Sequence, residues 1–177
     1  MEPYTPLMTE HELIRTAFSV VEKEIQRMEE SGKANDEFVN LIADFFIDYI
    51  DISHHGKEEN ILFKALQKKK ISKQHAEMMN ILLKEHEKGR QIVRTLMNAA
   101  DEYFKKGSQA HFPNIVSGLK DIVYVYKEHI KKEDNEFFVP VMDYFTESEK
   151  EEILKKFWQF DVNIIHEKYK NLFEAME

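Results

Sequence analysis

The sequence predicts an all-α protein, an up-down-up-down four-helix bundle with an additional C-terminal helix. Three observations favour this fold. The 177 residues include only five glycines and four prolines, apolar residues recur at alternating steps of three and four along long segments, and a motif pair repeats after about 75 residues. The length suits one domain. We expect the bundle to span residues 1–145 and the last helix, 146–177, to pack on the bundle or on a partner.

Charge and composition exclude several classes of function. The formal net charge of -8 argues against a nucleic-acid or anionic-membrane partner, which would need a basic face. The chain has no cysteine, so any metal must bind through nitrogen and oxygen. The N-terminus lacks the features of a signal peptide, and no apolar run is long enough to cross a bilayer. A cytoplasmic protein is therefore expected.

The first helix is predicted over residues 9–32, with Thr9 as its N-cap. Its inward positions carry apolar residues with one exception, His11 near the beginning of the stripe. The full inward series reads Leu7, His11, Ile14, Phe18, Val21, Ile25 and Met28.

The second helix is predicted to begin after an Asn35 or Asp36 cap and to end near the lysines at 68–70. Its expected inward series is Leu41, Phe45, Asp48, Ile52, His55, Glu59, Leu62 and Leu66. His55 and Glu59 are four residues apart and share one helix face. His54 and Glu58 have the same spacing but lie one position off this stripe, which predicts a surface or outer role. Gly56 costs roughly 1 kcal/mol relative to alanine, so close packing or room for a ligand is expected there.

The third and fourth helices carry the matching polar residues. Ser72 is expected to cap the third helix, which ends at 107–108 and contains His86 on its inward face. The fourth helix runs from Pro113 to about Pro140, with His129 and Glu133 on its apolar stripe. Asp134 competes with Glu133 as the inward carboxylate, but the parallel with the second helix favours Glu133.

A capping box is expected where the last helix begins, formed by Thr146 and Glu149. One face of this helix is apolar, through Ile153, Phe157, Phe160, Ile164, Tyr169 and Phe173. The remaining histidines, His75, His111 and His166, are expected to be ordinary surface or partly buried residues.

An internal repeat relates the first two helices to the next two. Glu10-His11-Glu12 with Arg15 reappears 75 residues later as Glu85-His86-Glu87 with Arg90, and His55 precedes His129 by 74 residues. The repeat predicts a pseudo-twofold bundle in which every helix gives an inward histidine and two helices also give a glutamate. The predicted metal ligands are His11, His55, Glu59, His86, His129 and Glu133.

Four neutral imidazoles and two carboxylates suit a pair of borderline divalent ions, iron first and manganese or zinc after it, whereas calcium and magnesium prefer oxygen. Two histidines on each metal, with glutamates bridging, would leave open positions for water, hydroxide or a small diatomic ligand. Ligand histidines usually donate their second nitrogen to a carboxylate, and Glu10, Glu12 and Glu85 are close in sequence. Arg15 and Arg90 could pair with adjacent glutamates, and Tyr49, Tyr124 and Tyr126 could line the pocket.

This pattern of His11, His55-x-x-x-Glu59, His86 and His129-x-x-x-Glu133 resembles the hemerythrin-like (HHE cation-binding) family over about residues 7–145. It is most similar to the iron-sulfur-cluster repair type, which has two His-x-x-x-Glu motifs. The resemblance implies two non-heme iron ions, a diiron centre with an oxo or hydroxo bridge. Oxygen carriers of the family have a second histidine on the third helix, where this chain has Leu82 and Arg90. The chain also lacks the cysteine-containing N-terminal extension of the repair proteins.

The expected function is binding of a small oxidant or diatomic ligand (O2, NO or peroxide) for sensing, storage or detoxification. A diiron peroxide- or NO-reducing activity is compatible with the resemblance. The alternative is an iron sensor, or an iron donor for repair of iron-sulfur centres. The expected partners are the small ligand and, through residues 146–177, a second copy or another protein.

Overall fold

The structure is a computed structural model that describes residues 1–161 and 163–176, and it describes no side chains within 163–167. The predictions for Ile164 and His166 therefore lie outside the described side chains. The described residues form helices joined by short turns, which confirms the all-α prediction. None of the helices described is long and apolar enough to cross a membrane.

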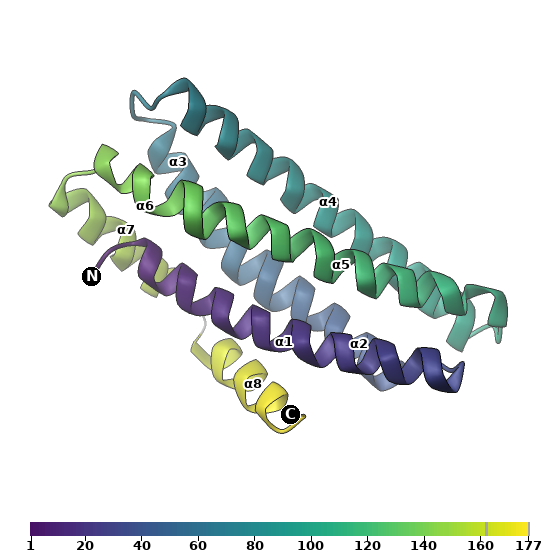
Figure 1. Ribbon diagram of the computed structural model, residues 1–177. Helices are drawn as coiled ribbons and strands as arrows, with labels where there is room; N and C mark the ends of the chain where they lie inside the picture. The colour runs from purple at the N-terminus through teal and green to yellow at the C-terminus, as the bar shows by residue number, and fades with distance from the viewer. Residues whose placement is uncertain (162, 177) are drawn as a thin grey trace.

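Four long rods lie side by side and alternate in direction (Figure 1). The second and fourth rods each contain π-helical segments within a continuous helix. The first rod is α1 (Tyr4–Ser31), and the second is α2 (Asp36–Asp44), η1 (Phe45–His55), η2 (Glu58–Leu62) and α3 (Phe63–Leu66). The third rod is α4 (Lys73–Phe104), and the fourth is α5 (Phe112–Lys132), η4 (Glu133–Phe137) and α6 (Phe138–Val141). Two short 3-10 segments, η3 (Gln109–His111) and η5 (Met142–Tyr144), complete the bundle.

Three of the predicted helix caps are confirmed. The Asn35 side chain accepts from the Phe38 amide (3.2 Å), and the Ser72 hydroxyl accepts from the His75 amide (3.1 Å). Thr146 forms the expected capping box. The Thr9 cap is wrong, because α1 begins at Tyr4 and the Thr9 hydroxyl donates to a carbonyl inside the helix. Prolines in a first turn are tolerated, since the N–H they lack has no partner there.

The C-terminal segment forms two helices, α7 (Glu147–Phe160) and α8 (Asn163–Glu174), where one was predicted. The backbone is extended at Asp161, with φ -75° and ψ 124°. The Asp161 carboxylate lies 3.4 Å from the buried Lys57 Nζ, a contact that a continuous amphipathic pattern does not reveal. In Figure 1, α8 lies beside the bundle, where it contacts α1 and η1.

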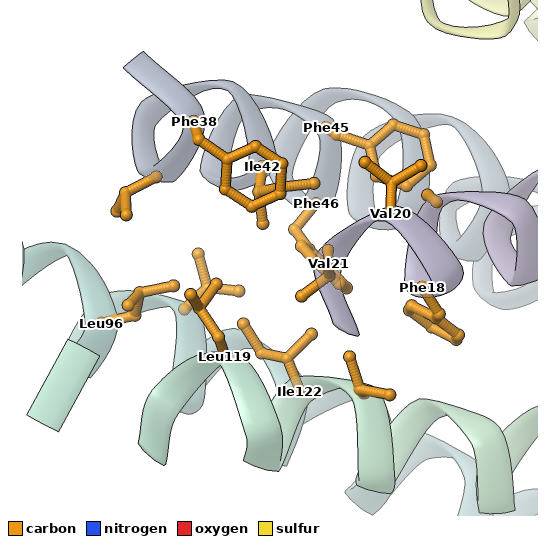
Figure 2. Packing of buried hydrophobic residues seen from close by; sticks show 14 of the residues in the cluster. Phe18, Val20, Val21, Phe38, Ile42, Phe45, Phe46, Leu96, Leu119 and Ile122 are labelled. Carbon is orange, nitrogen blue, oxygen red and sulfur yellow. The ribbon is translucent and has the colours of Figure 1, made fainter. Parts of the chain in front are cut away.

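The apolar interior is divided into two clusters. In the larger cluster, Phe18 and Val21 of α1 and Phe46 of η1 face Leu119 and Ile122 of α5 (Figure 2). The smaller cluster fills the opposite end of the bundle, around Leu7, Leu62, Leu82 and Phe137. Every rod buries at least one histidine or glutamate between the two clusters.

The second rod buries a stripe of residues spaced by four, which differs from the predicted alternation of three and four. In an ideal α-helix, each residue of such a stripe is displaced by about 40° around the helix axis from the residue four positions earlier. Because π turns have more residues per turn, they keep the stripe on one face of the rod. The predicted inward residue Ile52 is 57% exposed, and Asp48 is only half-buried. The buried stripe is Phe38, Ile42, Phe46, Ile50, His54, Glu58, Leu62 and Leu66.

Candidate metal centre

Seven buried histidines and glutamates form a polar layer between the two apolar clusters. All four rods contribute to it, and each of the seven side chains is at most 2% exposed. These residues are His11, His54, His55, Glu58, His86, His129 and Glu133.

Four of the histidines direct their Nε2 atoms toward the centre of the layer in two pairs. The Nε2 atoms of His11 and His54 lie 3.0 Å apart, and those of His86 and His129 lie 3.1 Å apart. Two facing nitrogen lone pairs at this distance repel each other unless a proton or a cation lies between them. Two nitrogens bonded at right angles to one divalent ion, each at about 2.1 Å, would be about 3.0 Å apart.

Glu58 and Glu133 connect these two histidine pairs. Glu58 Oε1 lies 3.3 Å from His54 Nε2, and its Oε2 lies 3.4 Å from His86 Nε2. Glu133 Oε2 lies 3.3 Å from His11 Nε2, and its Oε1 lies 3.1 Å from His129 Nε2. Each carboxylate thus presents one oxygen to each pair, the arrangement required of a bridging ligand.

The ligand atoms form two groups, each within 4.8 Å. We name them the His11/His54 half-site (His11, His54, Glu58 and Glu133) and the His55/His86/His129 half-site (His55, Glu58, His86 and His129). The ring of His55 stacks on that of His86, with centroids 3.8 Å apart. Both half-sites therefore have four members, three histidines and one glutamate in the His55/His86/His129 half-site and two of each in the other.

Each of these histidines has a carboxylate near its outer nitrogen, Nδ1. Such a carboxylate accepts the Nδ1 hydrogen and leaves the Nε2 lone pair directed inward. The pairs are His11 with Asp134 (2.7 Å), His54 with Glu10 (2.7 Å), His86 with Glu59 (2.7 Å), His129 with Glu85 (3.0 Å) and His55 with Asp51 (3.4 Å).

Cations neutralise these outer carboxylates. Arg90 donates to Asp51 and to Glu59, both at 2.7 Å. Arg15 pairs with Asp134, Lys57 with Glu10, and Lys132 with Glu85. The histidine orientations are therefore fixed by a second layer of paired charges.

Burial and charge separate the pKa values of the central residues. Burial, with Glu133 nearby, raises the pKa of Glu58 well above its usual range. For Glu133 the histidines outweigh burial and hold the pKa well below its usual range. Burial lowers the pKa of His54 to about 4, whereas at His129 the carboxylates of Glu133 and Glu85 outweigh burial and raise it to about 9. Glu58 and His129 thus favour their protonated forms, whereas Glu133 and His54 favour their deprotonated forms.

The layer contains buried polar atoms that hydrogen bonds do not satisfy. His55 Nε2 and all four carboxylate oxygens of Glu58 and Glu133 have no hydrogen-bond partner. Leaving such groups buried costs several kcal/mol in total. A divalent cation accepts electron pairs from all of these atoms, so the donor set fits metal ions of the kind that imidazole and carboxylate both bind.

Five of the six predicted ligands are brought together, and Glu59 is not. Glu59 lies outside both half-sites, where its carboxylate accepts from His86 Nδ1 and from Arg90. His54 and Glu58, predicted to have a surface or outer role, are buried in the layer. The π turns of the second rod cause the difference, because they put the four-spaced stripe on the inner face.

The internal repeat contains a signal that identifies His54 and Glu58. An offset of 75 residues, which relates His11 to His86, also relates His54 to His129 and Glu58 to Glu133. The offset of 74 that was assigned to the second motif is therefore wrong. His55 matches Ile130 under the 75-residue offset and is an additional histidine of the first half of the chain.

Predictions for the surrounding residues have mixed outcomes. Asp134 holds His11 from outside, and Glu133 lies in the layer, as expected. Tyr126 stacks near His55 with centroids 5.8 Å apart, whereas Tyr124 is 70% exposed and cannot line the site. The pairs expected for Glu10 and Glu85 are present, but Glu12 pairs with Arg15 instead.

The predicted close packing at Gly56 is present. A Cβ at this position would lie 2.6 Å from the Phe160 ring of α7. Gly56 therefore makes room for the C-terminal segment and not for a bound ligand.

The fold and the site together define a class of protein: four-helix bundles that hold metal between facing histidines and carboxylates. Comparison with protein families agrees, since residues 2–139 match the hemerythrin HHE cation binding domain. The match covers more than half of the chain, which therefore belongs to the hemerythrin HHE cation-binding family. Comparisons with curated proteins and with solved structures gave no significant match.

Proposed function

We propose that this protein binds two iron ions, one in each half-site, and that it uses their open positions to bind O2, NO or peroxide. The observation that carries the proposal is the pair of half-sites joined by Glu58 and Glu133, whose four oxygens have no hydrogen-bond partner. Two bridging anions would offset the charge of two closely spaced cations. A pair of redox-active ions with open coordination positions would bind small oxidants.

A surface pocket supports the access of a small ligand. Its volume is about 360 Å³, and it extends to Asp51 and Tyr126, which contact His55, and to Arg90, which shares Glu59 with His86. Aliphatic and aromatic side chains form most of its remaining wall, including Phe46, Ile47, Val93 and Met97. Such a wall suits an uncharged diatomic molecule better than a large anion.

The proposal is tested with protein reconstituted anaerobically with Fe(II). We expect about two irons per chain after desalting, and new visible absorption when O2 or NO is added while the iron is retained. The His86→Ala variant should lose iron, and the control His75→Ala, which alters a histidine outside both half-sites, should not.

Two results would overturn the proposal. A metal content near zero in wild-type protein would contradict metal binding itself. Two bound irons with no spectral response, together with rapid transfer of iron to a chelator, would contradict ligand binding and favour the alternative of an iron sensor or donor.

A further inference from the structure

The two halves of the bundle are related by the 75-residue repeat, and the described part of the C-terminal helices contacts mainly the first of them, through α1, η1 and η2. We use the term C-terminal arm for residues 147–161 and 163–176, which contain α7 and α8. Tyr169 and Phe173 of the arm are buried, and their rings lie 5.1 and 4.8 Å from that of Phe45 in η1. The arm therefore packs on the outer face of the second rod.

None of the described residues covers the equivalent position of the fourth rod in this way. Tyr49 is 1% exposed, whereas its repeat partner Tyr124 is 70% exposed. Gly56, which receives Phe160, corresponds to the exposed Lys131. The sequence of the second rod is thus adapted to the arm at positions where the fourth rod is adapted to solvent.

A chain of polar contacts leads from the arm to a metal-facing histidine. Asp161 Oδ1 lies 3.4 Å from Lys57 Nζ and accepts a hydrogen bond from Ser53 Oγ, also at 3.4 Å. Lys57 donates to Glu10 Oε1, and the other oxygen of Glu10 lies 2.7 Å from His54 Nδ1. Three contacts therefore connect Asp161 to the ring of His54.

The repeat provides an internal comparison for this chain. Lys132 and Glu85 hold His129 as Lys57 and Glu10 hold His54. The side chain of Lys132 is 31% exposed, whereas that of Lys57 is 1% exposed. A buried ammonium requires paired anions to offset its desolvation, and Asp161 adds an anion to Lys57 that has no counterpart beside Lys132 among the described residues.

We propose that Asp161 and Lys57 are positioning residues for the His11/His54 half-site, and that docking of the C-terminal arm and metal retention in this half-site reinforce each other. This inference rests on the proposed metal binding. The His11/His54 half-site has two imidazoles and Glu133 where the other half-site has three imidazoles, so a change in the orientation of His54 affects half of its nitrogen ligands. Because coupling is reciprocal, metal should in turn hold the arm on the bundle.

The test compares wild type with Asp161→Asn, an isosteric change that removes one negative charge. Both proteins are loaded anaerobically with Fe(II) and then challenged with a chelator. We expect one of the two ions to leave Asp161→Asn about 10-fold faster, the usual order for loss of an outer partner, while the second ion leaves at the wild-type rate. The control Asp121→Asn makes the same charge change on the exposed face of α5 and should release both ions as wild type does.

A second readout follows the arm directly. Hydrogen exchange of residues 168–174 should slow when Fe(II) is added to wild type and should respond less in Asp161→Asn. Circular dichroism of both variants is measured to check that the bundle is folded. The inference would be overturned if Asp161→Asn released both ions at the wild-type rates and if metal left the hydrogen exchange of the arm unchanged. The proposed metal binding would then remain intact. Failure of wild type to bind metal at all would instead refute the proposed function on which it rests.

Discussion

Glu58 and Glu59 are neighbours in the sequence, but their carboxylates have different surroundings. Glu58 is fully buried and presents an oxygen to each histidine pair. Glu59 is partly exposed and accepts from His86 Nδ1 and Arg90. We therefore assign Glu58 to direct metal contact and Glu59 to the support of His86.

Exchanging each carboxylate for its amide should separate these roles. Glu58→Gln removes an anion that belongs to both half-sites, so we expect bound iron to fall from about two to below one per chain. Glu59→Gln should keep both irons, with affinity weakened about 10-fold. Metal content after desalting and competition with a chelator measure the two effects. Loss of metal from Glu59→Gln with retention in Glu58→Gln would reverse the assignment.

Metal binding near pH 7 should release protons. The pKa of Glu58 is raised well above its usual range by burial, and that of His129 is about 9. His129 therefore holds a proton at pH 7 without metal, the raised pKa of Glu58 favours its protonated form, and each group must be deprotonated to become a ligand. Calorimetric titration with metal in buffers of different ionisation enthalpy should show a heat that depends on the buffer. The same heat in every buffer would contradict this expectation.

The sequence predicted the types of ligand and most of their positions, but it did not distinguish His54 and Glu58 from their neighbours. A stripe with α-helical spacing selects His55 and Glu59, because that spacing does not allow for the π turns that change the inward face. The 75-residue repeat contained the missing information. His55 remained a site residue under both interpretations, because its Nε2 also lies in the layer.

At the scale of helices, the prediction was accurate for α1, whose backbone is α-helical throughout. Every predicted inward residue of α1 is at most 5% exposed. The second rod departed from prediction because η1 and η2 change its periodicity. The break between α7 and α8 was missed because the apolar pattern continues through it. Asp161, where the backbone is extended, contacts Lys57, which lies 104 positions away in the sequence.

Two buried glycines of the bundle offer a matched test of packing between helices. A Cβ at Gly89 of α4 would lie 2.3 Å from Tyr126 Oη, whereas one at Gly118 of α5 would lie 3.3 Å from Leu96 Cβ. Alanine gains roughly 1 kcal/mol of helix propensity at either position, but overpacking costs about 1–3 kcal/mol. We expect Gly89→Ala to lower the free energy of unfolding measured in urea, and Gly118→Ala to change it little. Equal effects would show that Tyr126 moves aside freely.

At the scale of the whole molecule, the polar layer makes stability depend on metal. Binding to the folded state alone contributes about 2.7 kcal/mol when free metal is 100-fold above Kd. For a chain of this size that corresponds to a rise in Tm of roughly 5–10 °C. Thermal unfolding with Fe(II) under anaerobic conditions, and again with a chelator, measures the difference. Mg²⁺, which prefers oxygen ligands, should have a much smaller effect.

Identical melting temperatures with and without metal would contradict the dependence of the core on metal. Without bound metal, a layer of seven polar side chains remains buried between the two apolar clusters. Protonation can neutralise part of this charge, but it cannot satisfy all of the carboxylate oxygens that lack partners.

The repeat has a consequence for how the protein matures during synthesis. The hairpin of residues 4–66 carries His11, His54, His55 and Glu58, and the hairpin of residues 73–141 carries His86, His129 and Glu133. Because each half-site draws on both hairpins, the nascent first hairpin emerges with an incomplete set of ligands. Iron uptake into both half-sites should therefore be completed late, when the second hairpin adds His86, His129 and Glu133.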